Sequence, residues 1–135
     1  RKALLEFNRA VATDGDYYNA YFNRGNVHKD MKLYAKALND YSKAIALHPK
    51  FSLAYNNRGL VYYYLEDYNR AVRDFSSAIR SDPRLAIAYN NRGAVYSRLR
   101  NYNSAADDFR KALALDPGLR SARKNILLVT KKKQR

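Results

Sequence analysis

Apolar residues recur along this chain at intervals of three and four positions, which is the spacing of one face of an α-helix. In residues 52–85, one apolar face includes Tyr55 and Val61, and a second one includes Ala71 and Phe75. Only a few polar residues separate the two faces, so the connection between them is a short turn. The pattern therefore predicts two amphipathic helices that fold back on each other as a hairpin.

The two-helix pattern recurs along the chain with a fixed period. Glycine, proline, tyrosine and alanine all keep this period, which is typical of arrays of helical hairpins. The recurring positions are Gly25, Gly59 and Gly93; Pro49, Pro83 and Pro117; Tyr21, Tyr55 and Tyr89; Ala37, Ala71 and Ala105; and Ala44, Ala78 and Ala112. The period predicts an all-α fold in which residues 1–135 form one array, with full repeats at 18–51, 52–85 and 86–119.

The small residues of each repeat predict where its two helices touch. Gly59 lies on the first helix, and Ala71 and Ala78 lie on the second. Glycine costs about 1 kcal/mol relative to alanine inside a helix, so its recurrence indicates a close approach that offsets this cost. We expect the aromatic residues to fill the space on either side.

Polar residues and prolines mark the expected helix ends. Asp67 and Asn101 precede the second helices of their repeats, where a side-chain oxygen can accept a hydrogen bond from a free backbone N–H. Pro83 and Pro117 follow those helices, and proline disfavours helix in the residue before it. Each hairpin is therefore expected to end just before its proline.

The first residues fit the register of the second helix of a preceding repeat. In residues 1–17, Ala3 and Phe7 lie one full period before Ala37 and Tyr41. An array that opens with half a repeat exposes a helix face. Self-association through this open N-terminal face is therefore one expectation.

The last residues depart from the repeat, since Arg123 and Leu127 replace its aromatic residue and its glycine. Residues 120–135 still predict a helix that closes the array. They contain seven basic and no acidic residues, which suits either a solubilising cap or a surface for polyanions. The expected apolar face of this helix comprises Ala122, Ile126, Leu127 and Val129.

Composition narrows the classes of partner. The chain has 26 Lys and Arg against 12 Asp and Glu, a net charge of +14, so acidic or neutral partners are expected. It has no cysteine, which excludes disulfides and thiolate chemistry. No apolar run reaches the roughly 20 residues of a membrane span, and we expect a cytoplasmic protein. The chain does not begin with Met, so native ends and targeting signals can lie outside it.

No catalytic constellation is visible, and we expect neither an enzyme nor a cofactor or metal site. His28 and His48 are the only histidines, and His28 occupies the register of Tyr62, which favours a packed, hydrogen-bonded role. The acidic pairs Glu66-Asp67 and Asp107-Asp108 are interpreted as capping or solvated residues. The glycines are too widely spaced to form a phosphate-binding loop.

The periodic pattern of aromatic, Gly, Tyr, Ala, aromatic, Ala and Pro resembles the tetratricopeptide repeat, and the match covers nearly the whole chain. The resemblance implies a right-handed superhelical α-solenoid and a non-catalytic scaffold. Its expected activity is to bind an extended or helical peptide segment of another protein in its concave groove.

The first helix of each repeat lines the concave side of such arrays, which predicts a peptide-binding groove. Asn23, Asn57, Asn91 and Asn125 form a ladder with one residue per repeat, and an amide can pair with a peptide backbone in two directions. The ladder is similar to the asparagine ladder of the O-linked N-acetylglucosamine transferase superhelix, which holds extended peptides. Bonding to a neighbouring helix is the alternative. The predicted groove residues are Asn19, Phe22, Asn23, Asn26, Lys29, Leu53, Asn56, Asn57, Leu60, Tyr63, Tyr64, Ile87, Asn90, Asn91, Ala94, Arg98 and Asn125.

A second precedent in the family, the carboxylate clamp for chaperone tails, is not supported. Asn26 and Asn57 match its asparagines, but Phe22, Ile87 and Asn91 occupy the registers of its basic residues. The competing function from another class is binding of nucleic acid or another polyanion by the basic C-terminal helix.

Overall fold

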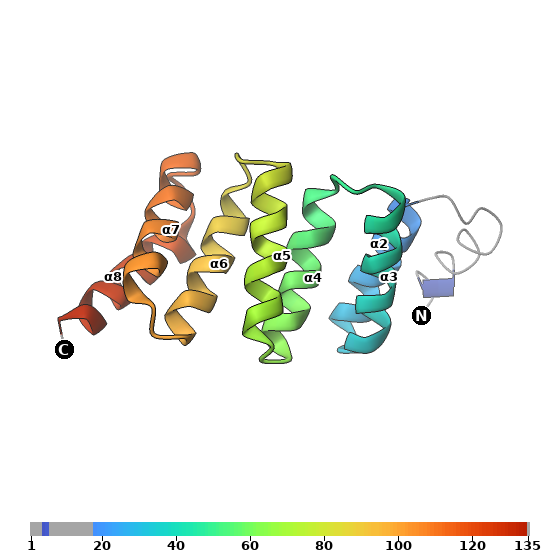
Figure 1. The fold of residues 1–135 in the computed structure, drawn as a ribbon, viewed down its shortest axis with the longest axis horizontal. Helices are drawn as coiled ribbons and strands as arrows, with labels where there is room; N and C mark the ends of the chain where they lie inside the picture. The colour runs from blue at the N-terminus through green and yellow to red at the C-terminus, as the bar shows by residue number, and fades with distance from the viewer. Residues whose placement is uncertain (1–3, 6–17, 135) are drawn as a thin grey trace.

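The structure is a computed structural model that describes residues 4–5 and 18–134. The helix expected within residues 1–17 lies outside the described residues, apart from Leu4 and Leu5. The helices α2 to α8 follow one another along an elongated row (Figure 1). Their bounds are Tyr18–Asp30 (α2), Tyr34–Leu47 (α3), Ser52–Tyr64 (α4), Tyr68–Ser81 (α5), Ala86–Arg98 (α6), Tyr102–Leu115 (α7) and Arg120–Lys133 (α8).

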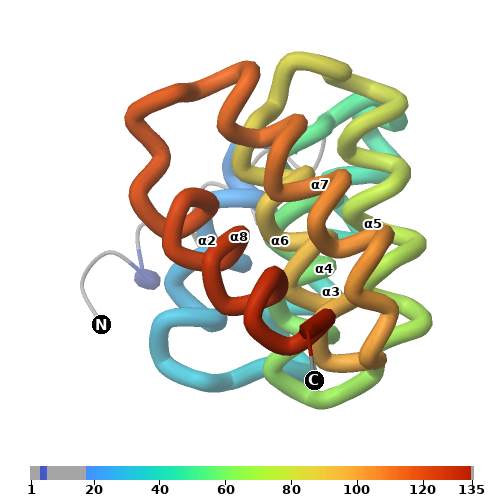
Figure 2. The backbone as a smooth tube through the Cα atoms, turned by 90° about the vertical axis from the view of Figure 1, so that its left-hand side faces the viewer, coloured from blue at the N-terminus to red at the C-terminus, as the bar shows by residue number. Residues whose placement is uncertain are grey.

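The helices form antiparallel hairpins that stack into two layers, as the sequence pattern predicts. The hairpins are α2 with α3, α4 with α5, and α6 with α7, and α8 packs on the last of them. One layer holds α2, α4, α6 and α8, and the other holds α3, α5 and α7 (Figure 2). Among the described helices, consecutive members of the first layer touch, whereas those of the second do not. The first layer is therefore the inner side of the curve.

The glycines sit where an aromatic ring of the second helix crosses the first helix. A Cβ atom on Gly59 would lie 2.8 Å from Cε1 of Phe75, and one on Gly93 would lie 2.6 Å from Cε1 of Phe109. Both rings are buried, so neither has room to retreat. The predicted close approach of the two helices is confirmed.

Each hairpin is also held by an arginine of its first helix and an aspartate of its second. Nε and Nη2 of Arg92 both donate to the carboxylate of Asp108 at 2.8 Å, and Arg58 holds Asp74 in the same way. This bidentate hydrogen bond raises the pKa of Arg92. The interpretation of Asp108 as a solvated residue is wrong, because its side chain is buried against Arg92. Asp107 is exposed, as expected.

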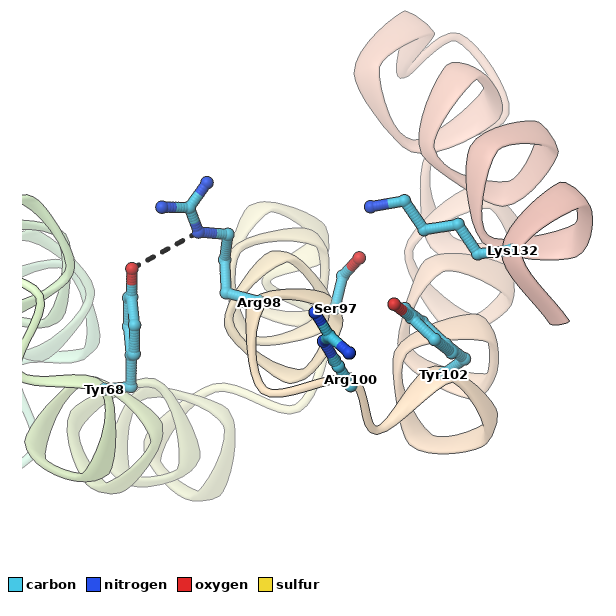
Figure 3. A pocket seen from close by; sticks show the side chains of 6 residues that line it. All are labelled: Tyr68, Ser97, Arg98, Arg100, Tyr102 and Lys132. Atoms are coloured by element: carbon cyan, nitrogen blue, oxygen red, sulfur yellow. Dashed lines mark hydrogen bonds between the residues drawn. The ribbon is translucent and has the colours of Figure 1, made fainter. Parts of the chain in front are cut away.

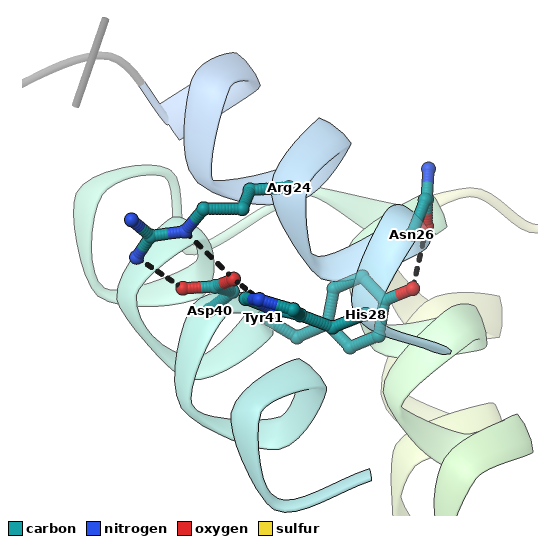
Figure 4. A network of polar contacts seen from close by, with 5 residues as sticks. All are labelled: Arg24, Asn26, His28, Asp40 and Tyr41. Carbon is teal, nitrogen blue, oxygen red and sulfur yellow. Dashed lines mark hydrogen bonds and ion pairs between the residues drawn. The ribbon is translucent and has the colours of Figure 1, made fainter. Parts of the chain in front are cut away.

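The first hairpin adds a histidine to this arrangement (Figure 4). Asp40 accepts hydrogen bonds from Nε and Nη2 of Arg24, and His28 donates from Nδ1 to Oδ2 of Asp40 at 2.8 Å. His28 is only 6% exposed. The predicted packed and hydrogen-bonded role of this histidine is confirmed.

The two expected helix caps behave differently. Asp67 accepts a hydrogen bond from the backbone N–H of Arg70 at 3.4 Å, which confirms its predicted role. Asn101 makes no such bond, so that prediction is wrong. A neutral amide gains less than a carboxylate from the positive end of a helix, and the Asn101 side chain stays in solvent.

Helix α8 closes the described array with a narrower apolar face than expected. Ala122 and Val129 are buried, and Val129 belongs to a hydrophobic cluster with Phe109 of α7, against which Ile126 packs. Leu127 is 63% exposed, so its predicted place on this face is wrong. It stands in the register of the repeat glycine, which faces a second helix in the other repeats, and no described helix packs over it here.

The turns inside the three hairpins each contain a residue with positive φ, and the residue types at these positions do not predict it. Lys32, Glu66 and Arg100 all have φ near +60°. Each turn is closed by a backbone bond over five residues, such as the one from the N–H of Asp67 to the carbonyl of Tyr62. This motif ends a helix with one left-handed residue, a position that favours glycine.

Replacing Lys32 with glycine is expected to raise the free energy of unfolding by about 0.5–1 kcal/mol, because glycine adopts positive φ without steric cost. Urea unfolding followed by circular dichroism measures the change. Lys111, an exposed residue inside α7, is the control, and its change to glycine should lower stability by about 1 kcal/mol. Loss of stability in both variants would contradict the assignment.

Candidate functional site

The inner layer presents large apolar side chains to solvent. Leu53 of α4 and Ile87 of α6 occupy the same position in successive repeats, and each is 43% exposed. Tyr64 at the end of α4 is 50% exposed, and Leu128 of α8 is 47% exposed. Single exposed apolar residues are common on proteins, but their recurrence on consecutive helices of one layer suits a surface that binds another protein.

The asparagine ladder is bonded to the neighbouring first helix over most of its length. Nδ2 of Asn57 donates to Oδ1 of Asn26 at 2.9 Å, Nδ2 of Asn91 donates to Asn56 at 3.0 Å, and Nδ2 of Asn125 donates to Asn90 at 3.3 Å. Each bond joins two consecutive helices of the inner layer. These bonds are the alternative that the sequence left open, and they leave part of each amide for other partners.

Two predicted groove residues are acceptors of these bonds and lie inside the protein. Asn56 is 2% exposed and Asn90 is 7% exposed, so the prediction that they face the groove is wrong. Helical spacing within one repeat places them near the groove, but the first helix of the following repeat, or α8 in the case of Asn90, covers them. Asn90 also donates to Oγ of Ser121 at 3.0 Å.

Asn26 has a further partner on the second helix of its own hairpin (Figure 4). The hydroxyl of Tyr41 donates to Oδ1 of Asn26 at 2.5 Å. Tyr41 is buried, and this burial raises the pKa of its hydroxyl well above the usual range. Asn26 is therefore held from two sides, by Tyr41 and by Asn57.

Four predicted residues meet in one groove pocket. Tyr63 of α4, Ala94 and Arg98 of α6, and Asn125 of α8 line a hollow of about 150 Å³, together with Leu128. Three consecutive first helices thus contribute to a single depression. Sequence reasoning missed Leu128, although it lies one full period after Ala94 and the repeat could have identified it.

Other predicted residues lie outside this pocket. Phe22 and Leu60 are half-buried and belong to hydrophobic clusters, and the Phe22 ring lies 4.7 Å from that of Phe51. Asn19 and Asn23 of α2 are exposed, and Lys29 of the same helix is half-buried. The predicted set is therefore divided between an open surface, a pocket and the packed interior.

A row of tyrosines runs beside the groove from one hairpin to the next. The rings of Tyr34 and Tyr64 are 5.9 Å apart, those of Tyr64 and Tyr63 are 6.1 Å apart, and those of Tyr63 and Tyr68 are 5.9 Å apart. We call these four residues the tyrosine row. It joins α3, α4 and α5, and aromatic rings in contact give a firm apolar surface.

The tyrosine row ends at a basic pocket of about 580 Å³ (Figure 3). Nε of Arg98 donates to the Tyr68 hydroxyl at 3.2 Å, and this bond raises the pKa of Arg98. The ammonium of Lys132 and the hydroxyl of Tyr102 point toward the end of α6 (Figure 3). The pocket is lined by Tyr68, Ser97, Arg98, Arg100, Tyr102 and Lys132.

Of the six residues of the basic pocket, only Arg98 was predicted. Lys132 stands one full period after Arg98, so the repeat carried into the last helix would have identified it. Arg100 and Tyr102 lie at the turn between α6 and α7, where only the fold shows that they approach α8.

Neither a metal site nor a membrane-spanning helix is found among the described residues. Within residues 4–5 and 18–134, no group of three His, Cys, Asp or Glu residues could hold a metal ion. None of the helices described for this chain combines the length and the apolar character that a membrane crossing requires.

Sequence profiles identify the repeat. A profile described as tetratricopeptide repeat matches residues 18–51 and 86–119, and a second profile of that description matches residues 40–73. A further profile, described as TPR repeat, matches residues 59–99. The sequence matches none of the curated proteins with which it was compared.

Solved structures agree with the profiles. The TPR domain of Arabidopsis OM64 is 30% identical with a TM-score of 0.83, over 85% of this chain and 95% of that one. The second TPR domain of human RPAP3, in complex with the HSP70 peptide SGPTIEEVD, is 28% identical with a TM-score of 0.78, over 82% and 92% of the two chains. MamA is 21% identical with a TM-score of 0.89, over 97% and 77%. With its profiles, its stacked hairpins and the OM64 match all in agreement, the chain belongs to the tetratricopeptide repeat family.

Proposed function

We propose that this chain is a non-catalytic scaffold that binds an extended or helical segment of another protein along its inner layer. The observation that carries the proposal is the exposure of Leu53, Tyr64, Ile87 and Leu128 on consecutive helices of that layer. Burying such side chains against a partner removes apolar area from water, which is the main driving force of protein association.

The asparagine ladder has spare hydrogen-bonding capacity for a peptide backbone. Nδ2 of Asn91 donates one bond to Asn56, and its Oδ1 accepts none from the described residues. Nδ2 of Asn125 likewise donates one bond to Asn90, and its Oδ1 accepts none from the described residues. Each of these amides can therefore still accept one hydrogen bond and donate another. We infer that they fix the direction of a bound peptide and contribute little to the choice of its side chains.

Charge biases the groove toward acidic or neutral ligands. Arg98 and Lys132 line the groove pocket together with the apolar residue Leu128. A similar domain in human RPAP3 is in complex with the HSP70 peptide SGPTIEEVD. Phe22, Ile87 and Asn91 occupy the registers of the basic clamp residues in this chain, so we do not extend that ligand to it.

Changing Leu53, Tyr64 and Ile87 together to serine is expected to weaken partner binding at least about 100-fold, because each loses more than about 1 kcal/mol of apolar burial. The partner is first isolated by affinity pull-down from cell extract, and its affinity is then measured by calorimetry. Circular dichroism checks that the helices remain. The control variant changes Met31, Leu47 and Leu65 to serine, three side chains of similar exposure outside the predicted groove. Equal loss in both variants would contradict the proposal.

The basic end of α8 supports the competing function. Lys131, Lys132 and Lys133 are all exposed on its last turn. Affinity for a polyanion such as RNA falls steeply with salt, whereas binding by apolar residues and amides responds weakly. The same pull-down is therefore run at low and moderate salt. Recovery of nucleic acid alone, lost at moderate salt and unchanged in the serine variant, would transfer the function to α8.

A further inference from the structure

Three cations line the basic pocket, and none of them is paired with a carboxylate of a described residue. Arg98 comes from the end of α6, Arg100 from the following turn and Lys132 from α8 (Figure 3). None of the six lining residues is acidic, and none of the three cations forms an ion pair with a described residue. The charge of Glu66 acts on Arg98 from a distance, without an ion pair between the two side chains. The like charges of these side chains repel one another, and a bound anion would reduce that repulsion.

Two of the three cations in this pocket contact neutral tyrosines. Nε of Arg98 is engaged by Tyr68, which leaves the two terminal nitrogens of that guanidinium able to donate. Nζ of Lys132 lies 5.9 Å from the centre of the Tyr102 ring. The hydroxyls of Ser97 and Tyr102 add two further donors at the same pocket. The arginines of the hairpins, such as Arg92, are by contrast paired with aspartate.

We propose that this pocket binds the phosphate group of a phosphorylated serine or threonine in the peptide that occupies the groove, an inference that rests on the proposed function. A phosphate monoester carries a charge of about −1.5 to −2 and three acceptor oxygens, whereas a carboxylate offers a single charge and two oxygens. The three cations, which come from α6, the following turn and α8, and the hydroxyls of Ser97 and Tyr102 suit the charge and the acceptor oxygens of a phosphate group. An arginine also binds phosphate oxygens with two parallel N–H donors.

Continuity with the groove points to a peptide as the carrier of this phosphate. Ser97, Arg98 and Lys132 line both the basic pocket and the groove pocket beside it. The tyrosine row connects the two pockets, because Tyr63 lines the groove pocket and Tyr68, the last member of the row, lines the basic pocket. A peptide lying on the exposed apolar residues would therefore reach the basic pocket with a side chain near α8. A nucleic acid would need a longer track of phosphate contacts than the six residues of this pocket provide.

The first experiment locates the anion site with inorganic phosphate and does not depend on the groove. Phosphate is titrated into the ¹⁵N-labelled chain at constant ionic strength. Saturable NMR shifts are expected at Ser97, Arg98, Arg100 and Tyr102. The test variant is Arg100→Gln with Lys132→Gln. The control variant is Arg84→Gln with Lys111→Gln, which removes the same charge from exposed positions outside the pocket. The shifts should vanish in the test variant and persist in the control.

The second experiment identifies the carrier with three pools of degenerate nonapeptides that have phosphoserine, serine or glutamate at the centre. The wild-type chain is expected to retain the phosphoserine pool about 10-fold better than either other pool, which is the typical gain from one charge-assisted bond. The test variant should lose this preference, and the control variant should keep it.

Several outcomes would overturn the phosphate proposal. These are phosphate shifts spread evenly over the basic surface, equal retention of the glutamate and phosphoserine pools, and tighter binding of a 20-nucleotide oligouridylate at the pocket than of any pool. A different result would contradict the proposed peptide binding in the groove. The phosphate shifts would still map to the pocket, while the serine variant of Leu53, Tyr64 and Ile87 would retain every pool as well as the wild type.

Discussion

Replacing Arg92 with methionine is expected to lower the free energy of unfolding by about 3 kcal/mol, the usual cost of stranding one charge of a buried ion pair. The carboxylate of Asp108, whose side chain is 8% exposed, would lose both of its 2.8 Å donors. The variant also loses the bond from Arg92 to Oγ of Ser76, which ties two neighbouring hairpins together. Urea unfolding followed by circular dichroism measures the change.

A second variant separates charge from packing. Changing Arg92 to methionine and Asp108 to leucine together should recover most of the loss, because no buried charge is left without a partner. Arg110 is the control, since its pair with Asp107 is exposed on both sides, and its change to methionine should cost less than about 0.5 kcal/mol. A double variant as unstable as Arg92→Met alone would contradict the assigned role of the pair.

Ion pairs of this kind were not predicted from the sequence, although their residues recur with the repeat. Arg58 and Asp74 each have a counterpart in the next repeat, so both were visible as periodic charges. Nothing in the period says that these two positions, which lie on different helices, face each other across a hairpin. An aspartate in a helix was therefore interpreted as solvated, which is the commoner case on protein surfaces.

The fold was far more predictable than the site. The period alone located the helices and the close approach at Gly59, because these features repeat within one hairpin and depend on local spacing. It placed the aromatic residues on either side of the crossing, whereas the Phe75 ring lies directly over Gly59. The burial of Asn56 and Asn90 depends on how closely the next hairpin approaches, and helical spacing within one repeat does not contain that distance. The basic pocket likewise needs Arg100 and Lys132, two residues that only the stacking of α8 brings together.

The other large effect is expected where the helices cross most closely. Gly93→Ala should lower the free energy of unfolding by about 2 kcal/mol, because the new Cβ would meet Phe109 at 2.6 Å and overpack a buried site. The better helix propensity of alanine, worth about 1 kcal/mol, offsets only part of this strain. Gly118→Ala is the control, since its Cβ would find its nearest neighbour, Asp116, at 3.5 Å in an exposed turn.

Coupling between the two positions tests the cause of that loss. Phe109→Leu removes Cε1 and Cζ of the ring, two of the three atoms nearest to the new Cβ, although it leaves a cavity of its own. The combined variant Gly93→Ala with Phe109→Leu should therefore lose less stability than the sum of the two single variants, by about 1 kcal/mol or more. Strict additivity in urea unfolding would mean that the glycine is required for a reason other than its contact with the ring. The same test at Gly59 and Phe75 should give the same sign, because the crossing geometry recurs at 2.8 Å in that hairpin.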